Sequence, residues 1–396
     1  MENTCRKKLF RVTTADISLD GLLKGQLKYL NQYFEVVGVA KDTGVLEEVG
    51  KREGIRVIDA PLERPISLIK DIRALWFLYR LFRKEKPWCV HANTPKGSLL
   101  SMIAAYFARV PFRIYTVTGL RYQGSYGILR QILSSMEIIT CKFANKVIPE
   151  GKGIKETLQK DGITKKELNV ILNGNINGID TDFFNPELFN YRNRIEGKLY
   201  TGNRNDIRND LGLKDDEFVF IFIGRIVRDK GINEIVSCMK RFKNEKRNVK
   251  LLLVGRFETE LDPLDFGNEE FLRTDTNVLF VGYQNDVRPF FIAADVLVFP
   301  SYREGFPNVV LQAGAMGLPA IVTDINGCNE IIQENVNGKI FSPRNAEALY
   351  EAMNWCLDNK ETVKNMASCS RKIIIDRYQQ KAVWEATLQE YRKFKK

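Results

Sequence analysis

The chain has 396 residues and a formal net charge of +11, with 44% hydrophobic and 28% charged residues. This length exceeds one ordinary hydrophobic core and fits two domains of about 150–200 residues each. The composition excludes a disordered chain. No apolar run approaches the roughly 18 residues that a membrane-spanning helix needs, and no apolar signal core follows the basic N-terminus, so we expect no export.

The seven cysteines are scattered, odd in number and without a Cys-x-x-Cys pair. They predict small reduced side chains in a cytoplasmic protein, with neither a disulfide framework nor a metal site. The positive charge favours partners that carry phosphate. Because it is dispersed and accompanies no nucleic-acid-binding signature, we expect no nucleic acid. A lipid-linked phosphate or the inner membrane face is the stronger expectation.

Apolar, β-branched runs alternate with segments of helical spacing in both halves of the chain. The first half has predicted strands at 9–14, 34–40, 56–59, 88–92, 112–118, 146–149 and 168–172, and predicted helices that include 21–33, 67–84 and 97–107. The second half has predicted strands at 218–224, 249–255, 277–281, 295–299, 320–323 and 339–341. This alternation indicates parallel sheets covered on both faces. The predicted fold is therefore α/β, with two Rossmann-like doubly wound domains facing a central cleft.

The expected domains are residues 1–185 and 186–376, with a C-terminal helix of about 377–396 that packs back on the first domain. A turn-rich stretch at 173–180 is the expected hinge. The polar stretch at 191–209 is expected to be a surface loop and the start of a helix.

Turns with candidate ligand-binding residues follow the predicted strands of the second half. In doubly wound sheets, this is where ligands bind. The turn at 224–231 combines glycine with the rigid guanidinium of Arg225 and the mobile ammonium of Lys230, which suits a diphosphate. Gly255-Arg256 and Gly282-Tyr283 follow the next two strands and are placed to flank a nucleobase. For Gly255-Arg256 alone, a turn with a solvated arginine is the favoured alternative.

A fourth turn begins at Glu304 and continues through Gly305, Phe306, Pro307 and Asn308, between a buried strand and a helical segment. It places a carboxylate beside bare backbone N–H groups, which is the chemistry needed to hold sugar hydroxyls and the attached phosphates. An acidic helix start stabilised by the helix dipole is the structural alternative. Together, the four turns predict an enzyme that acts on a sugar nucleotide.

The motifs of the second half follow in a fixed order: Gly-Arg-x4-Lys-Gly at 224–231, Val-Gly-Arg at 254–256, Glu-Gly-Phe-Pro-Asn-Val-Val-Leu at 304–311, Gly-Leu-Pro-Ala-Ile-Val-Thr-Asp at 317–324, then Glu330 and Asn337-Gly338. This order resembles the family 4 retaining glycosyltransferases of the GT-B fold. The first-half segments 90–97, 115–120 and 177–180 resemble the branch that makes bacterial capsule, lipopolysaccharide O-antigen and exopolysaccharide. The resemblance covers nearly the whole chain, and its motifs are more specific in the second half.

The resemblance implies roles for individual residues. Arg225 and Lys230 would bind the donor diphosphate and steady the leaving nucleotide, and Glu304 would contact the transferred sugar. These three are the expected catalytic residues. The expected donor-binding residues are Gly224, Arg225, Lys230, Arg256, Gly305, Phe306, Pro307, Asn308 and Gln312. No metal and no cofactor is expected.

The sequence departs from the family pattern at two positions. Gln312 stands where the family usually has a second glutamate for the ribose hydroxyls, and we expect altered but not lost ribose binding, because an amide also donates and accepts hydrogen bonds. Thr118 stands where many members have a histidine. The only histidine, His91, lies at a strand end, and we favour a structural role for it.

The resemblance implies a cytoplasmic enzyme, peripheral on the inner membrane face, that moves a hexose or N-acetylhexosamine from a nucleotide diphosphate sugar. UDP-sugar is favoured over GDP-sugar, and a polyprenyl-diphosphate-linked saccharide is the expected acceptor. In such retaining transfer the departing phosphate itself takes the acceptor proton, so the diphosphate needs electrostatic stabilisation more than the acceptor needs a strong base. A sugar-nucleotide epimerase of the same fold and a non-catalytic scaffold that binds sugar nucleotide remain as alternatives.

The acceptor is expected on the first half. Helix 67–84 has an apolar side that we expect to pack on its sheet, with contact to a membrane as the alternative, since basic residues surround it. Lys96 and the glycine-rich loop at 119–127 are candidates for acceptor phosphates. Two other motifs are interpreted as structural: Asp180-Thr181-Asp182 as part of the hinge, and Gly151-Lys152-Gly153 as an incomplete dinucleotide fingerprint.

Overall fold

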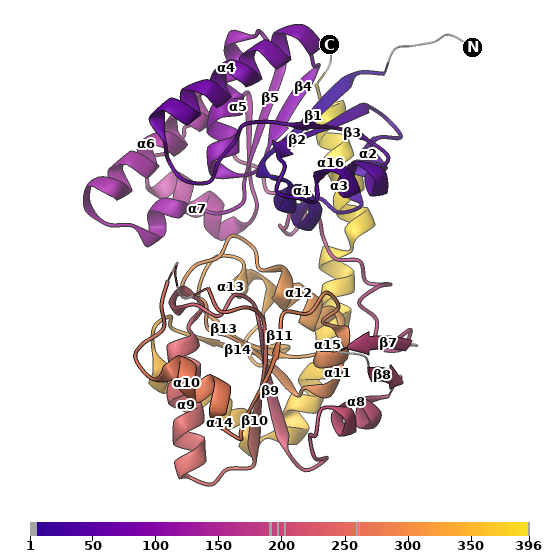
Figure 1. Cartoon of the computed structure of the whole chain (residues 1–396), viewed down its shortest axis with the longest axis vertical. Coiled ribbons are helices and arrows are strands. Elements are labelled where there is room, and N and C mark those ends of the chain that lie inside the picture. The colour runs from indigo at the N-terminus through magenta and orange to yellow at the C-terminus, as the bar shows by residue number, and fades with distance from the viewer. Residues whose placement is uncertain are drawn as a thin grey trace. The chain divides into compact units, whose positions relative to one another are not determined.

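The computed structural model describes residues 6–189, 192–195, 198–201, 203–258, 260 and 262–394. The chain divides into two compact units, Met1–Gly178 with Gln380–Lys396, and Ile179–Gln379. We call them the N-terminal and C-terminal units (Figure 1). The domains expected from the sequence divide the chain after residues 185 and 376, whereas the two units divide it a few residues away, after Gly178 and Gln379. Among the described helices, none has the length and apolar character needed to cross a bilayer.

The N-terminal unit is built on six parallel strands in the order β3-β2-β1-β4-β5-β6. The strands are β1 (Lys8–Ala15), β2 (Glu35–Lys41), β3 (Arg56–Asp59), β4 (Cys89–Ala92), β5 (Phe112–Val117) and β6 (Lys146–Pro149). All six were predicted. The seventh predicted strand, 168–172, is wrong, because this segment makes only an isolated bridge from Leu168 to Val147.

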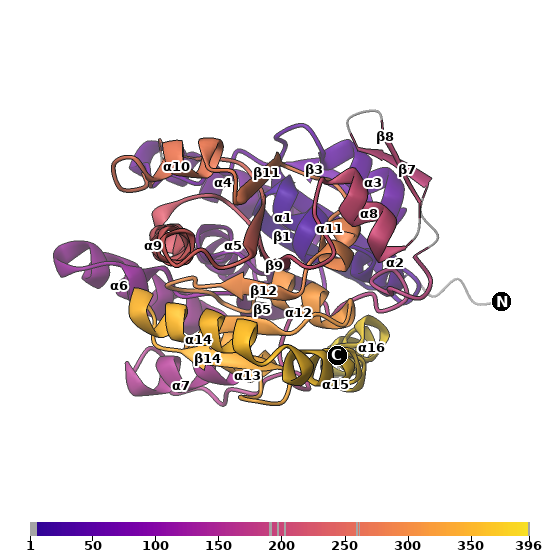
Figure 2. The same cartoon turned by 90° about the horizontal axis from the view of Figure 1, so that it is seen from below.

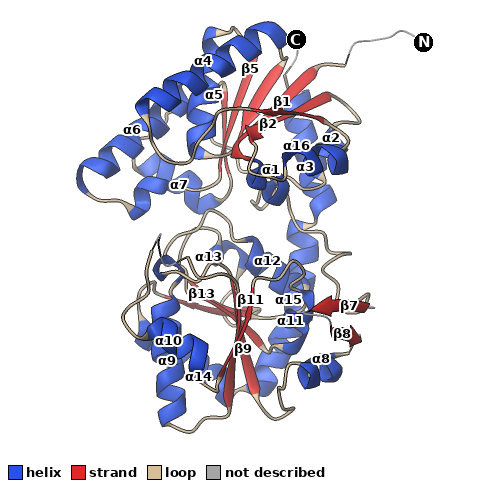
Figure 3. Ribbon diagram, viewed as in Figure 1, coloured by secondary structure: helices blue, strands red, loops and turns tan. Residues whose placement is uncertain are grey.

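Helices cover both faces of this sheet (Figure 3). The buried side chains of one face pack against α4 (Leu68–Glu85), α5 (Pro95–Phe107), α6 (Gly127–Phe143) and α7 (Lys152–Lys160). Those of the other face pack against α1 (Asp16–Leu22), α2 (Gln26–Leu30), α3 (Leu46–Glu53) and α16 (Gln380–Arg392). The single helix predicted at 21–33 is broken between α1 and α2, where Gly25 adopts a φ of 80°. A short 3₁₀ helix, η1 (Arg121–Gly124), precedes α6.

One buried carboxyl group lies between α6 and the sheet. The hydroxyl of Tyr115 donates a hydrogen bond of 2.7 Å to the carboxylate of Glu137, which is 5% exposed. Burial raises the pKa of Glu137 from 4.5 to about 7, and the hydrogen bond from Tyr115 opposes this shift. Because the folded chain holds this proton to higher pH than the unfolded chain does, the folded state loses stability as pH rises from about 4.5 to about 7.

We therefore expect Glu137→Gln to flatten the pH dependence of stability. Between pH 6 and pH 8 the wild-type chain should lose about 1.4 kcal/mol that the variant keeps, or a few degrees in melting temperature. Thermal unfolding of both proteins at the two pH values measures this difference. A Tyr115→Phe control should retain the pH-dependent loss, since it keeps the buried carboxyl group. Equal pH dependence in wild type and Glu137→Gln would contradict the assignment.

The C-terminal unit repeats the same topology, with six parallel strands in the order β11-β10-β9-β12-β13-β14. The strands are β9 (Phe218–Ile223), β10 (Val249–Val254), β11 (Val278–Gly282), β12 (Val296–Phe299), β13 (Ala320–Thr323) and β14 (Gly338–Phe341). Helices lie on both faces of this sheet (Figure 2). They are α8 (Arg204–Asp210), α9 (Ile232–Asn244), α10 (Asn268–Thr274), α11 (Arg288–Ala293), α12 (Asn308–Ala315), α13 (Cys328–Ile331), α14 (Ala346–Asp358) and α15 (Lys360–Tyr378).

The stretch expected to be a surface loop, 191–209, contains a small antiparallel hairpin instead. Its strands are β7 (Arg192–Ile195) and β8 (Lys198–Thr201), which pair with each other and with no other strand that the structure describes. Neither four-residue strand alternates apolar and polar residues, so the sequence gives no signal for a strand here. The expected helix start is present, since α8 begins at Arg204 with Asn203 as its side-chain cap.

Strand order in the C-terminal sheet reverses between β9 and β12, so the loops that follow these strands meet at the same edge. The 3₁₀ helix η2 (Arg228–Lys230) follows β9 and ends at Gly231, which has a φ of 72°. A Cβ atom at Gly231 would lie 2.2 Å from the carbonyl oxygen of Pro300, directly after β12. The two loops therefore touch at a point where only glycine fits.

Gly212 provides a matched control, because its φ is 69° but a Cβ atom there would have no neighbour within 4 Å. We expect Gly212→Ala to lose about 1–2 kcal/mol of stability from the left-handed conformation alone. Gly231→Ala should lose that amount and a further contribution from the backbone clash, which adds several degrees to the fall in melting temperature. Thermal unfolding of the two variants measures the difference, and equal losses would contradict the tight loop contact.

Candidate functional site

The carboxyl edge of the C-terminal sheet brings together two of the three residues predicted to be catalytic. The ammonium of Lys230, at the end of η2, forms an ion pair with the Oε1 atom of Glu304, in the loop after β12. Their side chains are only 14% and 17% exposed. A pair so poorly hydrated has a stronger mutual attraction than a surface pair, and removal of either partner leaves an uncompensated charge.

A serine that sequence reasoning missed completes this pair. Ser301 is fully buried, and its hydroxyl donates a hydrogen bond of 2.8 Å to Oε1 of Glu304 and lies 3.5 Å from Nζ of Lys230. Its own carbonyl oxygen accepts a 2.6 Å hydrogen bond from the hydroxyl of Thr323, at the end of β13. Ser301 therefore orients the carboxylate and ties the loops after β12 and β13 together. Its place directly after a strand and Pro300 was the available sequence signal.

The turn after Glu304 is anchored in the core. The ring of Phe306 is buried, with its centroid 5.6 Å from that of Tyr378 on α15. Pro307 precedes α12, and its carbonyl oxygen accepts the N–H of Val310, with no side chain capping the helix start. The side chain of Phe306 thus supports the turn from the interior, which leaves contact with a ligand to the backbone and to Glu304.

The third predicted catalytic residue, Arg225, does not contact the other two. Its guanidinium lies 3.3 Å from the carboxylate of Glu258, and both side chains are partly exposed. A surface ion pair of this kind contributes little and exchanges readily for a stronger anion, such as a diphosphate. The side chain of Arg256 packs on an aromatic ring, with its guanidinium 4.2 Å from the ring centroid of the exposed Tyr283. The loops after β10 and β11 therefore present a flat cation–aromatic pair.

Gln312, expected at the ribose hydroxyls, lies half-buried on α12. Among the described residues, no hydrogen bond joins its side chain to Lys230 or Glu304.

Thr118, in the N-terminal unit, already donates a 2.8 Å hydrogen bond from its hydroxyl to the carbonyl of Asn93. Asp180 accepts hydrogen bonds from the N–H groups of Asp182 and Phe183, at 3.1 and 3.0 Å, which is the geometry of a local turn.

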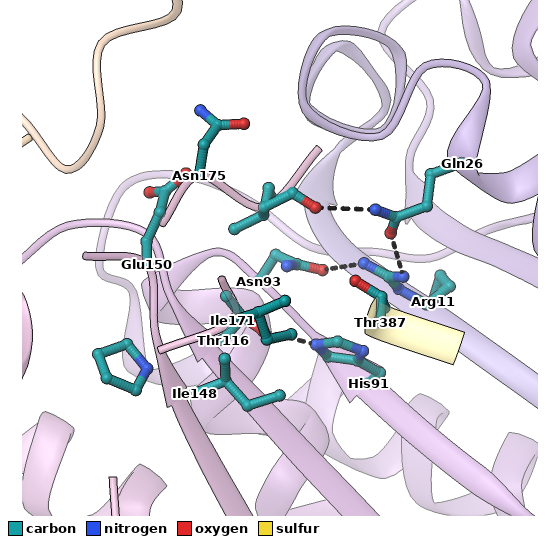
Figure 4. Close-up of a pocket in the computed structure, with 12 residues that line it drawn as sticks. Arg11, Gln26, His91, Asn93, Thr116, Ile148, Glu150, Ile171, Asn175 and Thr387 are labelled. Atoms are coloured by element: carbon teal, nitrogen blue, oxygen red, sulfur yellow. Dashed lines mark hydrogen bonds between the residues drawn. The ribbon is translucent and has the colours of Figure 1, made fainter. Parts of the chain in front are cut away.

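A buried polar cluster lies in the N-terminal unit between β1, β4 and α16 (Figure 4). The guanidinium of Arg11 is fully buried and donates to Gln26 at 2.7 Å and to Asn93 at 2.9 Å. The ring nitrogens of His91 lie 2.5 Å from the hydroxyl of Tyr391 and 2.7 Å from that of Thr116. Burial, with the nearby Arg11, holds the pKa of His91 well below its usual value. His91 is thus a neutral side chain with both nitrogens engaged.

The cavity within this cluster has a volume of about 20 Å³. Nε of Arg11 and Nδ2 of Asn93 are buried there without a partner among the described residues. The space suits about one water molecule and is too small for a phosphate or a sugar. The cluster therefore joins α16 to the sheet and is not a substrate site.

Lys96, a candidate for binding the acceptor phosphate, is already engaged by partners within the N-terminal unit. It is buried at the start of α5, forms an ion pair with Asp71 on α4, and donates to the carbonyl of Pro65. The lysine therefore fastens the first turn of α4 to the first turn of α5, and its charge is already neutralised. The expectation that Lys96 meets an acceptor phosphate does not fit this geometry.

Comparison with known proteins identifies the family to which both units belong. A family model described as glycosyl transferases group 1 matches residues 203–373, and one described as glycosyltransferase family 4 matches residues 27–183. The capsular polysaccharide biosynthesis glycosyltransferase CapM of Staphylococcus aureus is 30% identical over 391 residues, covering 98% of each chain. The UDP-Gal:alpha-D-GlcNAc-diphosphoundecaprenol alpha-1,3-galactosyltransferase of Escherichia coli is 28% identical over 87% of this chain and 85% of its own.

Solved structures agree on the fold. The Anabaena protein HepE, in complex with UDP and glucose, superposes with a TM-score of 0.79 at 17% identity and covers 98% of this chain and 100% of its own. Two parallel sheets of the same topology, the family matches over both units and the full-length likeness to CapM all agree with the resemblance found in the sequence. The chain belongs to the family 4 glycosyltransferases of the GT-B fold.

Proposed function

We propose that this glycosyltransferase moves a hexose or N-acetylhexosamine, with retention, from a UDP-sugar to a polyprenyl-diphosphate-linked saccharide during surface polysaccharide synthesis. The observation that carries the proposal is the Lys230–Glu304 ion pair at the strand-order reversal of the C-terminal sheet. The diphosphoundecaprenol-linked saccharide named for the Escherichia coli galactosyltransferase supports the acceptor class, and the capsular polysaccharide synthesis named for CapM supports a role in surface polysaccharide synthesis. They also favour transfer over epimerisation or a scaffold role.

The residues of the site divide the donor between them. Lys230 faces the phosphates, where its ammonium stabilises the negative charge that develops as the sugar leaves. Glu304 accepts hydrogen bonds from hydroxyls of the transferred sugar, and Ser301 keeps its carboxylate oriented. Arg225 exchanges Glu258 for a phosphate oxygen. Arg256 and Tyr283 border the nucleobase, and Gln312 hydrogen-bonds the ribose hydroxyls.

The reaction balances without a side-chain base. The acceptor hydroxyl oxygen forms a bond to the anomeric carbon while the bond from that carbon to the diphosphate oxygen breaks. The acceptor proton passes to the departing phosphate oxygen on the same face of the sugar, and the nucleoside diphosphate leaves. His91 takes no part, since it is buried, neutral and hydrogen-bonded through both nitrogens.

The nucleotide is proposed to be UDP because UDP is bound in the HepE structure and UDP-Gal is the donor named for the Escherichia coli relative. We expect UDP to raise the melting temperature of this chain, GDP to leave it nearly unchanged, and slow hydrolysis of one UDP-sugar to identify the sugar. A thermal-shift screen of both nucleotides, with donor hydrolysis followed in parallel, measures this. Stabilisation by GDP alone would contradict the proposed nucleotide, and binding without turnover on any lipid-linked acceptor would favour the scaffold.

The ion pair makes a sharper prediction about donor binding. Lys230→Ala removes a positive charge and also leaves the Glu304 carboxylate uncompensated near the phosphates. We expect this variant to bind UDP at least about tenfold more weakly and to turn over about 10²–10³-fold more slowly. Adding Glu304→Gln should restore part of the UDP affinity but none of the turnover, because the repelling charge is gone while the sugar contact is weakened. Calorimetric titration with UDP measures the affinities.

Lys364→Ala serves as the matched control, since Lys364 lies in the same unit and pairs with Glu361 on the surface of α15. It should leave UDP affinity and turnover unchanged. An equal loss of affinity for Lys230→Ala in the presence and absence of Glu304 would show that the two side chains act independently. That result would remove the ion pair from the proposed site.

We propose in addition that the enzyme works at the inner membrane face, as a peripheral protein. A polyprenyl-linked acceptor is anchored in the bilayer, so its diphosphate lies at the membrane surface. The net charge of +11 favours an anionic leaflet.

A further inference from the structure

Helix α4 has two apolar faces, of which only one is covered. Ala74, Leu78 and Phe82 are buried against the N-terminal sheet. Four large side chains lie on the exposed side: Leu68, Ile69, Ile72 and Trp76, with exposures from 58% to 82%. The expectation that the apolar residues of this helix pack on the sheet is therefore wrong for its first half. Monomeric proteins rarely leave so many neighbouring apolar side chains in water without a use for them.

Helix α6 repeats this pattern. Leu133, Glu137, Thr140 and Cys141 are its buried residues. The residues at its start are exposed and mostly apolar: Tyr126, Ile128, Leu129 and Ile132, with Ile128 at 76%. The first half of this helix thus contributes little to the core of its own unit, although isoleucine and leucine are among the residues that proteins most often bury.

The two apolar clusters belong to one region of the N-terminal unit. Helix α5 packs against both α4 and α6, and the three helices lie on the same face of the sheet (Figure 1). The Lys96–Asp71 ion pair holds the start of α4 to the start of α5, which directly follows β4. The start of α6 follows β5 through η1. Both clusters therefore lie beside the carboxyl edge of the sheet, where doubly wound folds receive their ligands.

Charge on the two helices has a single sign. Every exposed charged side chain of α4 and α6, both described throughout, is basic: Lys70, Arg73, Arg80, Arg83, Lys84, Arg130 and Lys142. Their acidic residues are neutralised or buried, since Asp71 pairs with Lys96, Glu85 pairs with Lys8 and Arg56, and Glu137 lies in the core. Exposed apolar side chains interspersed with lysine and arginine match the interface of an anionic bilayer, which offers acyl chains beneath phosphate groups.

We infer that the first halves of α4 and α6, with Ile66 and Tyr126, which precede them and are 51% and 75% exposed, form a docking surface for an anionic lipid bilayer. The inference rests on the proposed function, because docking here holds the ligand-binding edge of the N-terminal sheet against the membrane that carries the acceptor. A lipid-linked diphosphate then reaches this edge without leaving the bilayer. The basic residues on both helices favour an anionic bilayer over a second copy of the chain, which would bring like charges together.

The test uses two double variants of the full chain, Ile69→Asp/Ile72→Asp on α4 and Ile128→Asp/Leu129→Asp on α6. Leu188→Asp is the matched control, because Leu188 is 64% exposed and lies in the C-terminal unit. Sedimentation with vesicles of phosphatidylcholine containing phosphatidylglycerol, compared with phosphatidylcholine alone, measures docking. We expect the wild type and Leu188→Asp to bind the anionic vesicles, and each double variant to bind at least about tenfold more weakly. Added salt should weaken the wild-type binding.

Two further measurements separate the possible failures. Stabilisation by UDP and donor hydrolysis should be unchanged in the double variants, since the C-terminal unit is untouched, while transfer to a lipid-linked acceptor in vesicles should fall. Failure of the wild-type chain to bind anionic vesicles, or normal binding by the double variants, would overturn the inferred docking surface. A dimer that the same substitutions dissociate, without vesicle binding, would assign this face to a second copy. Vesicle binding without any UDP effect would instead overturn the proposed function.

Discussion

The ion pair between Lys230 and Glu304 is the interaction on which the candidate site of the C-terminal unit depends. Its partners come from loops after β9 and β12, the two strands at which the sheet order reverses. A largely buried pair of this kind is stable only while both charges are present and their remaining hydrogen bonds are satisfied. Ser301 supplies one of these bonds, and the contact of Gly231 with Pro300 holds the loops close enough for the pair to form.

In the proposed function, this pairing resolves a conflict in how the donor is bound. A carboxylate that binds sugar hydroxyls has to lie close to a diphosphate that repels it. With Lys230 beside Glu304, the two side chains together carry no net charge. In the proposed site, Lys230 offsets this repulsion while its ammonium faces the phosphates, and Arg225, held only by an exposed contact with Glu258, adds a second cation. The proposed site thus combines a fixed pair, in which Lys230 offsets the charge of Glu304, with a movable cation, Arg225, that is free to follow the phosphates.

Much of this arrangement follows from the sequence, because alternating strands and helices imply parallel sheets, and parallel strands place their following loops at one edge. The twelve strands of the two large sheets and the proximity of Lys230 to Glu304 are of this kind. Contacts that the strand order does not impose could not be predicted. Nothing near Lys96 in the sequence indicates that Asp71 neutralises it, and the spacing of apolar residues in α4 does not reveal which of its two faces meets the sheet.

The two units share one topology but present different side chains at the carboxyl edge of the sheet. In the C-terminal unit, charged side chains lie in the loops beyond β9 and β12. In the N-terminal unit, the equivalent strands β1 and β4 carry Arg11 and His91, whose hydrogen bonds to Gln26, Asn93, Thr116 and Tyr391 are internal. At the start of α5 in this unit, the charge of Lys96 is likewise neutralised by an ion pair with Asp71. What this unit offers outward beside the same edge is apolar surface with basic residues. Under the proposed function, the first kind of edge suits a water-soluble anionic donor, and the second suits an acceptor anchored in a bilayer.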